Sequence, residues 1–171
     1  MMIRLVFIFC MCSLHLAIGQ KVIKPTSEIK ITGKVISEKS FKLLDLDTFE
    51  QVSINDYTLY NKDGSLKNTL TKLKGIPIKS ILASVKYLDD NPRSLNEYYF
   101  IFTASDGYKV VFSWNEIYNT EVGNHLFIIT EIDGIHARDL PHSILFLSSS
   151  DLKTGLRYIK CLEKIEVKQI E

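Results

Sequence analysis

Cysteine is scarce in this sequence and is poorly placed for cross-links. Of the three cysteines, Cys10 and Cys12 lie in the first apolar run, and Cys161 stands alone near the C-terminus. If the first run is removed, one cysteine remains, and no disulfide can form within the chain. The fold must therefore be stabilised by its hydrophobic core.

An excess of charge of one sign is also absent. The chain has 21 basic and 20 acidic residues, and residues 20–171 are formally neutral because Arg4 precedes them. At the level of the whole chain, this balance gives no electrostatic footprint for nucleic acid or an anionic membrane. No apolar run after residue 18 approaches the roughly 20 residues that span a bilayer. Internal repeats, heptads and low-complexity tracts are missing too, which excludes solenoids and coiled coils.

The N-terminus has the three parts of a secretory signal. Arg4 provides the positive charge, residues 5–18 are almost entirely apolar, and Ala17 and Gly19 are the small residues before a cut at Gln20. An uncleaved anchor is the alternative, but the sequence becomes polar abruptly after Gly19. We therefore expect residues 1–19 to be a signal peptide, and the protein to be exported to the periplasm or secreted.

The remainder predicts one α+β domain. Residues 20–27, around Pro25, have no periodic pattern and are expected to be a flexible lead-in, so that the domain occupies residues 28–171. Short strands separated by turns, with few short helices, predict a mixed and mainly antiparallel sheet. The expected strands are 29–35, 52–60, 98–103, 108–112, 126–132, 143–147 and 157–167, and the expected helices are 45–49, 78–85 and 114–118.

Two groups of reactive side chains have ordinary structural explanations. His136, Asp139 and His142 have a spacing that would suit zinc on one helix face, but Pro141 argues against a helix there and favours a solvated loop. Cys161 lies within the pattern of the last strand, with no histidine or second cysteine near it in sequence. A buried cysteine of this kind behaves as a small hydrophobic residue, so we do not expect a nucleophile.

A third group suits an anion. Gly155 allows backbone amides to approach a ligand closely, and Arg157 and Lys160 follow it in the stretch 153–160. Arginine and lysine can bind a phosphate through charge-assisted hydrogen bonds. A solvated basic turn that leads into a strand is the alternative for these residues.

The order of several segments is that of a known family. They are 73–82, with the sequence LKGIPIKSIL, 103–108, 133–134, 140–147, 155–160 and 162–167. They resemble the oxidoreductase molybdopterin-binding domain of sulfite oxidases and periplasmic methionine-sulfoxide reductase catalytic subunits, and the resemblance extends over most of residues 41–168. The resemblance implies a sulfite-oxidase-type fold around a pterin with a terminal phosphate. It also implies that Gly155, Arg157 and Lys160 contact this molybdopterin cofactor.

The family's metal ligand is missing. Catalytic members bind molybdenum through a cysteine thiolate in the segment before the Gly-Ile-Pro helix, whereas residues 52–73 contain no cysteine. Serine or aspartate, here Ser53 or Asp56, is a poor substitute for a soft sulfur ligand. We therefore assign no catalytic and no metal-binding residues, and we lean against an enzyme.

These observations leave three functions. The first is an exported molybdopterin-binding-like protein that binds a pterin or another phosphorylated small molecule without catalysis. The second is an extracytoplasmic interaction module that has lost the cofactor and uses exposed aromatic rings to bind a protein partner. The third is a molybdenum oxidoreductase with Asp56 or Ser53 on the metal. The tyrosines considered for the second function are Tyr57, Tyr60, Tyr98, Tyr99, Tyr108 and Tyr118.

Overall fold

The computed structural model describes residues 23–61, 63–152 and 155–170. The expected signal peptide and the Lys153-Thr154 part of the basic stretch lie outside these ranges. Residues 23–27 of the expected lead-in contain no helix or strand. Here the backbone N–H of Lys24 donates to Ser105 Oγ at 3.0 Å, and Thr26 is buried.

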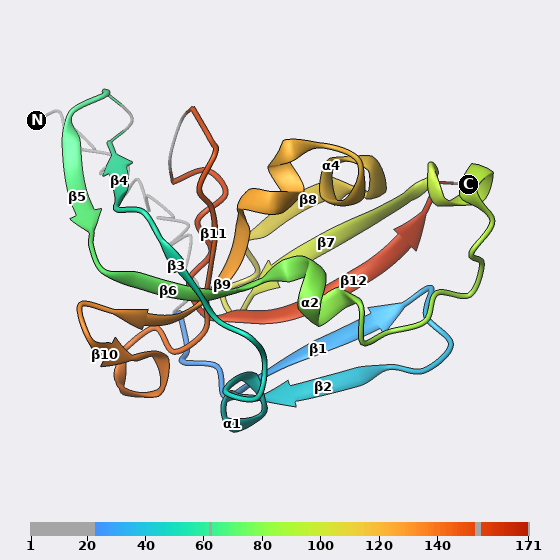
Figure 1. The fold of residues 1–171 in the computed structure, drawn as a ribbon, viewed down its shortest axis with the longest axis horizontal. Coiled ribbons are helices and arrows are strands. Elements are labelled where there is room, and N and C mark those ends of the chain that lie inside the picture. Colours follow the sequence, from blue (N-terminus) through green and yellow to red (C-terminus); the bar gives the residue numbers. More distant parts are fainter. Residues whose placement is uncertain (1–22, 62, 153–154, 171) are drawn as a thin grey trace, which may run out of the picture.

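The first of the two main sheets has five strands in the order β2-β1-β12-β7-β8 (Figure 1). β1 and β12 are parallel, and the other neighbours are antiparallel. Alternate residues of β1 and β12 are buried, because one face of the sheet covers the core. The strands are β1 (Glu28–Gly33), β2 (Lys39–Lys42), β7 (Tyr98–Ala104), β8 (Lys109–Ser113) and β12 (Leu162–Gln169).

The second main sheet has the order β10-β9-β6-β3, with β11 also paired to β9 and all pairs antiparallel. A separate hairpin, β4–β5, extends from this sheet at one end of the molecule (Figure 1). The strands are β3 (Val52–Ile54), β4 (Tyr57–Tyr60), β5 (Leu66–Leu70), β6 (Leu73–Pro77), β9 (Leu126–Ile132), β10 (Ile135–His136) and β11 (Leu145–Ser148).

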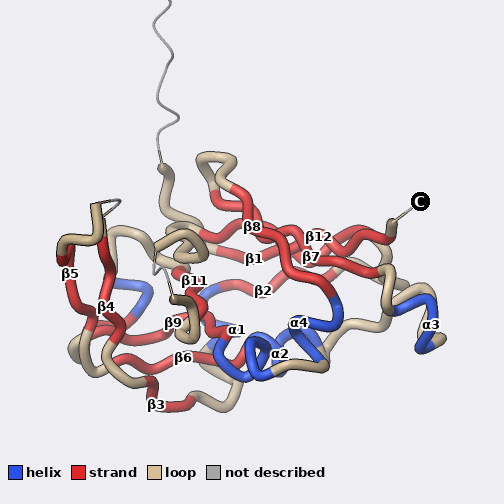
Figure 2. Tube along the Cα trace, turned by 90° about the horizontal axis from the view of Figure 1, so that it is seen from above, coloured by secondary structure: helices blue, strands red, loops and turns tan. Residues whose placement is uncertain are grey.

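The helices are short and lie on one side of the sheet that contains β1, β7, β8 and β12 (Figure 2). α4 begins at a capping box, in which Ser113 Oγ accepts from the N–H of Glu116 and the Glu116 carboxylate accepts from the N–H of Ser113. α2 follows Pro77, which suits the start of a helix. The helices are α1 (Leu43–Leu46), α2 (Ile78–Leu82), α3 (Pro92–Leu95) and α4 (Trp114–Tyr118), with 3₁₀ turns η1 (Glu121–His125) and η2 (Ala137–Asp139).

Two hydrophobic clusters hold the elements together. The larger contains the buried rings of Phe102, Phe112 and Phe146, with 4.6 Å between the ring centroids of Phe102 and Phe146. The smaller lies under the hairpin and includes Tyr57 and Leu59 of β4. The hairpin is therefore anchored to the body by its first strand.

The sequence predicted the fold class correctly and some element limits wrongly. The expected strand 52–60 is two strands, β3 and β4, separated at Asn55-Asp56. The last strand begins at Leu162 and not at residue 157, because Cys161 has a positive φ of 54° that does not fit a strand. The first helix begins at Leu43, earlier than predicted, and the second ends at Leu82. No helix in the described ranges has the length and apolar character needed to cross a membrane.

Candidate functional site

A cleft lies between the β4–β5 hairpin and the segment that leads into β12. Its volume is about 710 Å³. The hairpin and the segment are both visible beside β11 in Figure 1. The lining residues are Leu59, Tyr60, Asn61, Gly64, Lys67, Asn68, Leu70, Leu152, Gly155, Leu156, Tyr158 and Lys160.

The hairpin turn presents polar groups at the mouth of the cleft. The N–H of Asn61 donates to the carbonyl of Ser65 at 2.9 Å, and the Asn61 amide donates to Ser65 Oγ at 3.0 Å. Asp63 accepts from both the N–H and the hydroxyl of Ser65, which lowers the pKa of its carboxyl. The turn is thus closed by its own side chains and holds the Asn61 end of the wall in place.

The walls combine positive charge with apolar and aromatic surface. Lys67 comes from β5 and Lys160 from the opposite segment, and the described lining contains no carboxylate, imidazole or thiol. Two tyrosines, Tyr60 and Tyr158, and four leucines are also among the lining residues. Such a cleft favours a flat, apolar ligand that carries a negative group.

Gly155 brings the two sides together. Its φ is +102°, a conformation that glycine adopts easily, and a Cβ at this position would lie 3.9 Å from Leu59 Cδ2 and 4.0 Å from Tyr60 O. The hydroxyl of Tyr57, on β4, is buried, and burial raises the pKa of this hydroxyl to about 12. Burial also raises the pKa of Tyr158 to about 12. Both hydroxyls therefore stay neutral at physiological pH.

Arg157 is turned away from the cleft wall and into an ion-pair network. Its Nε donates to Asp151 Oδ2 at 2.8 Å, its terminal Nη2 also contacts Asp151, and Nη1 lies 3.3 Å from Glu116 Oε1. The guanidinium carbon lies 4.7 Å from the centroid of the Phe112 ring. The bond to Asp151 is the main reason that the pKa of Arg157 is raised. Of the three residues proposed from the sequence, Gly155 and Lys160 meet at the cleft, whereas Arg157 binds side chains of its own chain.

Lys160 has a partner that the sequence did not suggest. Its Nζ lies 3.2 Å from Nε2 of His142, which precedes β11. Lysine has no acceptor, so Nζ is the donor and the His142 ring must accept through an unprotonated Nε2. Burial, followed by the charge of Lys160, lowers the pKa of His142.

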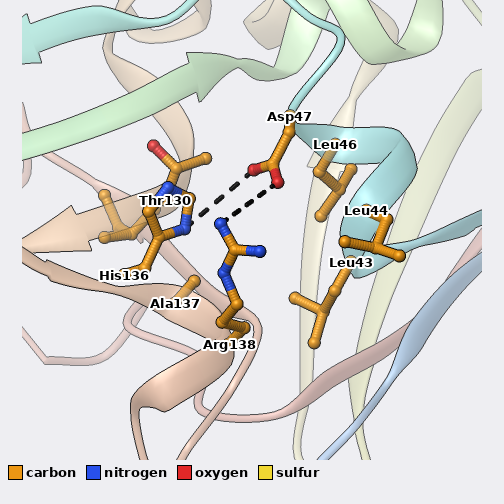
Figure 3. Close-up of a pocket in the computed structure, with 9 residues that line it drawn as sticks. Leu43, Leu44, Leu46, Asp47, Thr130, His136, Ala137 and Arg138 are labelled. Carbon is orange, nitrogen blue, oxygen red and sulfur yellow. Dashed lines mark ion pairs between the residues drawn. The ribbon is translucent and has the colours of Figure 1, made fainter.

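The other histidine of the suspected zinc group has a different environment. His136 Nδ1 lies 4.0 Å from Asp47 Oδ1, and Arg138 Nη2 lies 3.6 Å from Asp47 Oδ2 (Figure 3). The cavity beside these groups has a volume of only about 10 Å³, room for about one water molecule. Within residues 23–61, 63–152 and 155–170, no three histidine, cysteine, aspartate or glutamate side chains are grouped to hold a metal ion.

The cleft fits the organic part of a molybdopterin but not its metal. Lys160, Lys67 and the Gly155 backbone suit a phosphate, and the aromatic and leucine walls suit a ring. No lining side chain among the described residues offers sulfur, and neither Ser53 nor Asp56 belongs to the lining. Cys161 is 0% exposed, and burial raises the pKa of its thiol. The donor set therefore does not match a thiolate-bound molybdenum.

Sequence reasoning missed the hairpin half of the site. Tyr60, Asn61, Lys67 and Asn68 are distant from residue 160 in the sequence, and only the packing of the hairpin brings them there. The Asn61-Lys62-Asp63-Gly64 turn was the one available signal, since it predicts a loop that projects from two strands.

Comparisons with known proteins bear on the fold alone. No family model matches the sequence, and no curated protein matches it. Among solved structures, the sulfane dehydrogenase SoxCD from Paracoccus pantotrophus matches with a TM-score of 0.61 and 13% sequence identity. The match covers 88% of this chain but only 40% of that chain. The chain therefore has the mixed α+β fold of sulfite-oxidase type that the sequence predicted.

Proposed function

We propose that this protein is exported and binds a pterin or another phosphorylated small molecule, without catalysing a redox reaction. The observation that carries the proposal is the cleft, which Lys67 and Lys160 line together with leucines and two tyrosines and which has no carboxylate among its described lining residues. The resemblance of the sequence to the molybdopterin-binding domain makes molybdopterin the pterin to test first.

The two ends of the ligand would meet different residues. The phosphate would be held by Lys160, with the backbone at Gly155 close by, and the ring system by Tyr60, Tyr158 and the neighbouring leucines. A hydrogen bond to a charged group contributes about 1.5–3 kcal/mol, and aromatic contacts add about 0.5–1.5 kcal/mol each. One charged contact and two aromatic contacts of this size contribute at most about 6 kcal/mol, less than the roughly 8.2 kcal/mol of a micromolar complex, so apolar burial against the leucines would have to supply the rest.

The absence of redox chemistry follows from the donor set. When a molybdenum–pterin group is bound through a thiolate, it supplies oxygen-atom transfer, and soft sulfur is what holds and tunes the metal. The chain has no cysteine between Cys12 and Cys161, and Cys161 is buried outside the cleft lining. We therefore assign binding, not turnover, to this cleft.

An interaction module is the second candidate, and exposed leucines favour it. Leu152 is 99% exposed, and Leu156 and Leu66 are both 64% exposed around the same cleft. Arg157, which the sequence offered to a ligand, is instead satisfied by Asp151 and Glu116. Under this alternative the cleft receives an apolar side chain of a protein partner, and phosphate makes no difference to the affinity.

The charge of Lys160 distinguishes the two candidates. We expect Lys160→Glu to weaken binding of a fluorescent pterin monophosphate at least tenfold, because the substitution removes a charge-assisted hydrogen bond and adds repulsion. Lys39→Glu on the exposed edge strand β2 is the matched control and should leave the affinity unchanged. The measurement is fluorescence titration, with circular dichroism to verify that each variant is folded.

Cofactor analysis completes this test. The protein is purified from a host that makes molybdopterin, oxidised, and assayed for pterin fluorescence and molybdenum. Folded protein that carries no pterin and does not bind the pterin monophosphate would overturn the proposal in favour of the interaction module. Sulfite or sulfoxide turnover would overturn its non-catalytic part.

The proposed export predicts that the signal peptide is cleaved before Gln20. When the full chain is expressed with a functional secretion pathway, we expect the intact mass of the exported product to correspond to residues 20–171, because Ala17 and Gly19 fit the cleavage site. A product that keeps residues 1–19 and sediments with membranes would instead show an uncleaved anchor. Replacing Gly19 with a bulky residue is the control and should block the cut.

A further inference from the structure

β8 is an open edge of the sheet that contains β1, β7, β8 and β12. Within the described residues, β8 pairs with β7 on one side and with no strand on the other. Its sequence is KVVFS, which has a single charge and two β-branched residues. An edge of this kind presents unpaired N–H and C=O groups to any strand that approaches it. β8 can therefore accept a further strand.

The opposite edge of the same sheet is protected, whereas β8 is not. β2 has four residues, and two of them, Lys39 and Lys42, are exposed lysines of the kind that prevents edge strands from pairing. In β8 the middle residue, Val111, is apolar and 54% exposed. Ile101 of β7 is paired with Val111 and is half-buried. An apolar stripe on the outer face of the sheet thus leads to the open edge.

We propose that two copies of this chain associate by antiparallel pairing of β8 with β8 of the second copy. The two-fold axis would pass through Val111, perpendicular to the sheet, and the two sheets would join into one continuous sheet. None of the described residues that line the cleft belongs to β8, so this inference does not rest on the proposed function.

The sequence of β8 is complementary to itself in this register. Lys109 would lie opposite Ser113 of the second copy, Val110 opposite Phe112, and Val111 opposite its own copy. Each pair joins residues of the same face, because Val110 and Phe112 are buried and the other three residues lie on the outer face. Apolar cross-strand pairs stabilise a sheet, and like charges directly opposite each other destabilise it. This register makes apolar pairs on both faces and places no lysine opposite another.

Electrostatic repulsion does not oppose the pairing. Lys109 is two residues from the axis, so it and its copy would lie about 14 Å apart along the strands, beyond the Debye length of about 10 Å at 0.1 M salt. On the core face, Arg157 beside Phe112 is already paired with Asp151 and Glu116. One pair of five-residue strands spans only about 17 Å, so the interface falls below about 1,200 Å². We therefore expect a reversible dimer.

Sedimentation equilibrium over a wide range of protein concentration tests the proposal. We expect the purified protein to be a monomer at low concentration and a dimer at high concentration. Val111→Lys places two like charges opposite each other at the axis and should lower the association constant about tenfold or more. Ser40→Lys, on the exposed edge strand β2, adds the same charge at the other edge and should dimerise as the wild type does. Circular dichroism verifies that each variant is folded.

Val111→Cys provides a second measurement. In the dimer the two new thiols would face each other across the strand pair, with Cβ atoms about 4.5–5.5 Å apart. A short thiol-reactive cross-linker should therefore join two chains of this variant. Ser40→Cys is the matched control and should not be cross-linked. Cys161 does not interfere, because it is 0% exposed.

Four results would overturn the inference. The first is wild-type protein that stays monomeric at the highest concentration at which it is soluble. The second is a folded Val111→Lys variant that dimerises as the wild type does, because association would then use another surface. The third is equal cross-linking of Val111→Cys and Ser40→Cys. The fourth is an open-ended assembly that Ser40→Lys abolishes, which would mean that β8 pairs with β2 of the next copy.

Discussion

Arg157→Glu is expected to lower the free energy of unfolding by about 3–5 kcal/mol, the range for breaking a largely buried ion pair. The Asp151 side chain is only 8% exposed and Arg157 is 25% exposed, so water replaces the lost partner poorly. The new carboxylate would also face Asp151 and Glu116. At roughly 2–4 °C per kcal/mol for a domain of this size, the melting temperature should fall by about 10 °C. Urea unfolding is the measurement.

Arg138→Glu is the matched control, because it reverses the same charge in a weaker pair. Arg138 and Asp47 lie 3.6 Å apart and are 47% and 34% exposed, so we expect a loss below about 1 kcal/mol. Arg157→Lys, which keeps the charge but loses the forked geometry, should fall between the two and remain folded. If Arg157→Glu were as stable as the wild type but unable to bind the pterin monophosphate, Arg157 would be a ligand contact after all.

The position of Arg157 shows where the sequence was informative about the cleft and where it was not. The sequence indicated a glycine with flanking cations between Gly155 and Lys160, and Gly155 and Lys160 both line one cleft. Arg157 has the same local pattern, but its orientation is decided by Glu116 of α4 and Asp151. No local rule links residues 116 and 157, because their contact depends on how α4 packs in the folded domain.

Strands with a local apolar pattern were easier to predict than the cleft, because the cleft depends on contacts between residues that are distant in the sequence. The alternation of Ile29 and Ile31 with polar residues is a local signal, and β1 buries both side chains completely. The apolar run after Leu126 is equally local, and it forms the buried strand β9. By contrast, Lys67 has no apolar pattern around it, and β5 is almost entirely exposed. Its role depends on the packing of Tyr57 and Leu59 from the partner strand.

A large change in stability is expected from a single added methyl group at Gly33, at the end of β1, where a steric clash and an unfavourable φ coincide. A Cβ here would lie 2.1 Å from the carbonyl oxygen of Val167, and the φ of Gly33 is +94°. The unfavourable φ costs alanine about 1–2 kcal/mol, and the clash with a backbone atom adds about 1–3 kcal/mol. We therefore expect Gly33→Ala to lower the free energy of unfolding by about 2–5 kcal/mol, the sum of the two costs, measured by urea unfolding.

Gly134→Ala separates the two costs, because the φ of Gly134 is +80° and a methyl group there would meet no atom within 4 Å. This control should lose only the conformational part, about 1–2 kcal/mol. Equal losses in the two variants would show that β1 and β12 can move apart at Gly33 without cost.

Gly33 pairs with Val167, which lies at the end of β12 that is far from Lys160. Folded Gly33→Ala protein should therefore bind the pterin monophosphate as the wild type does, since the strain lies at the sheet end that does not form the cleft.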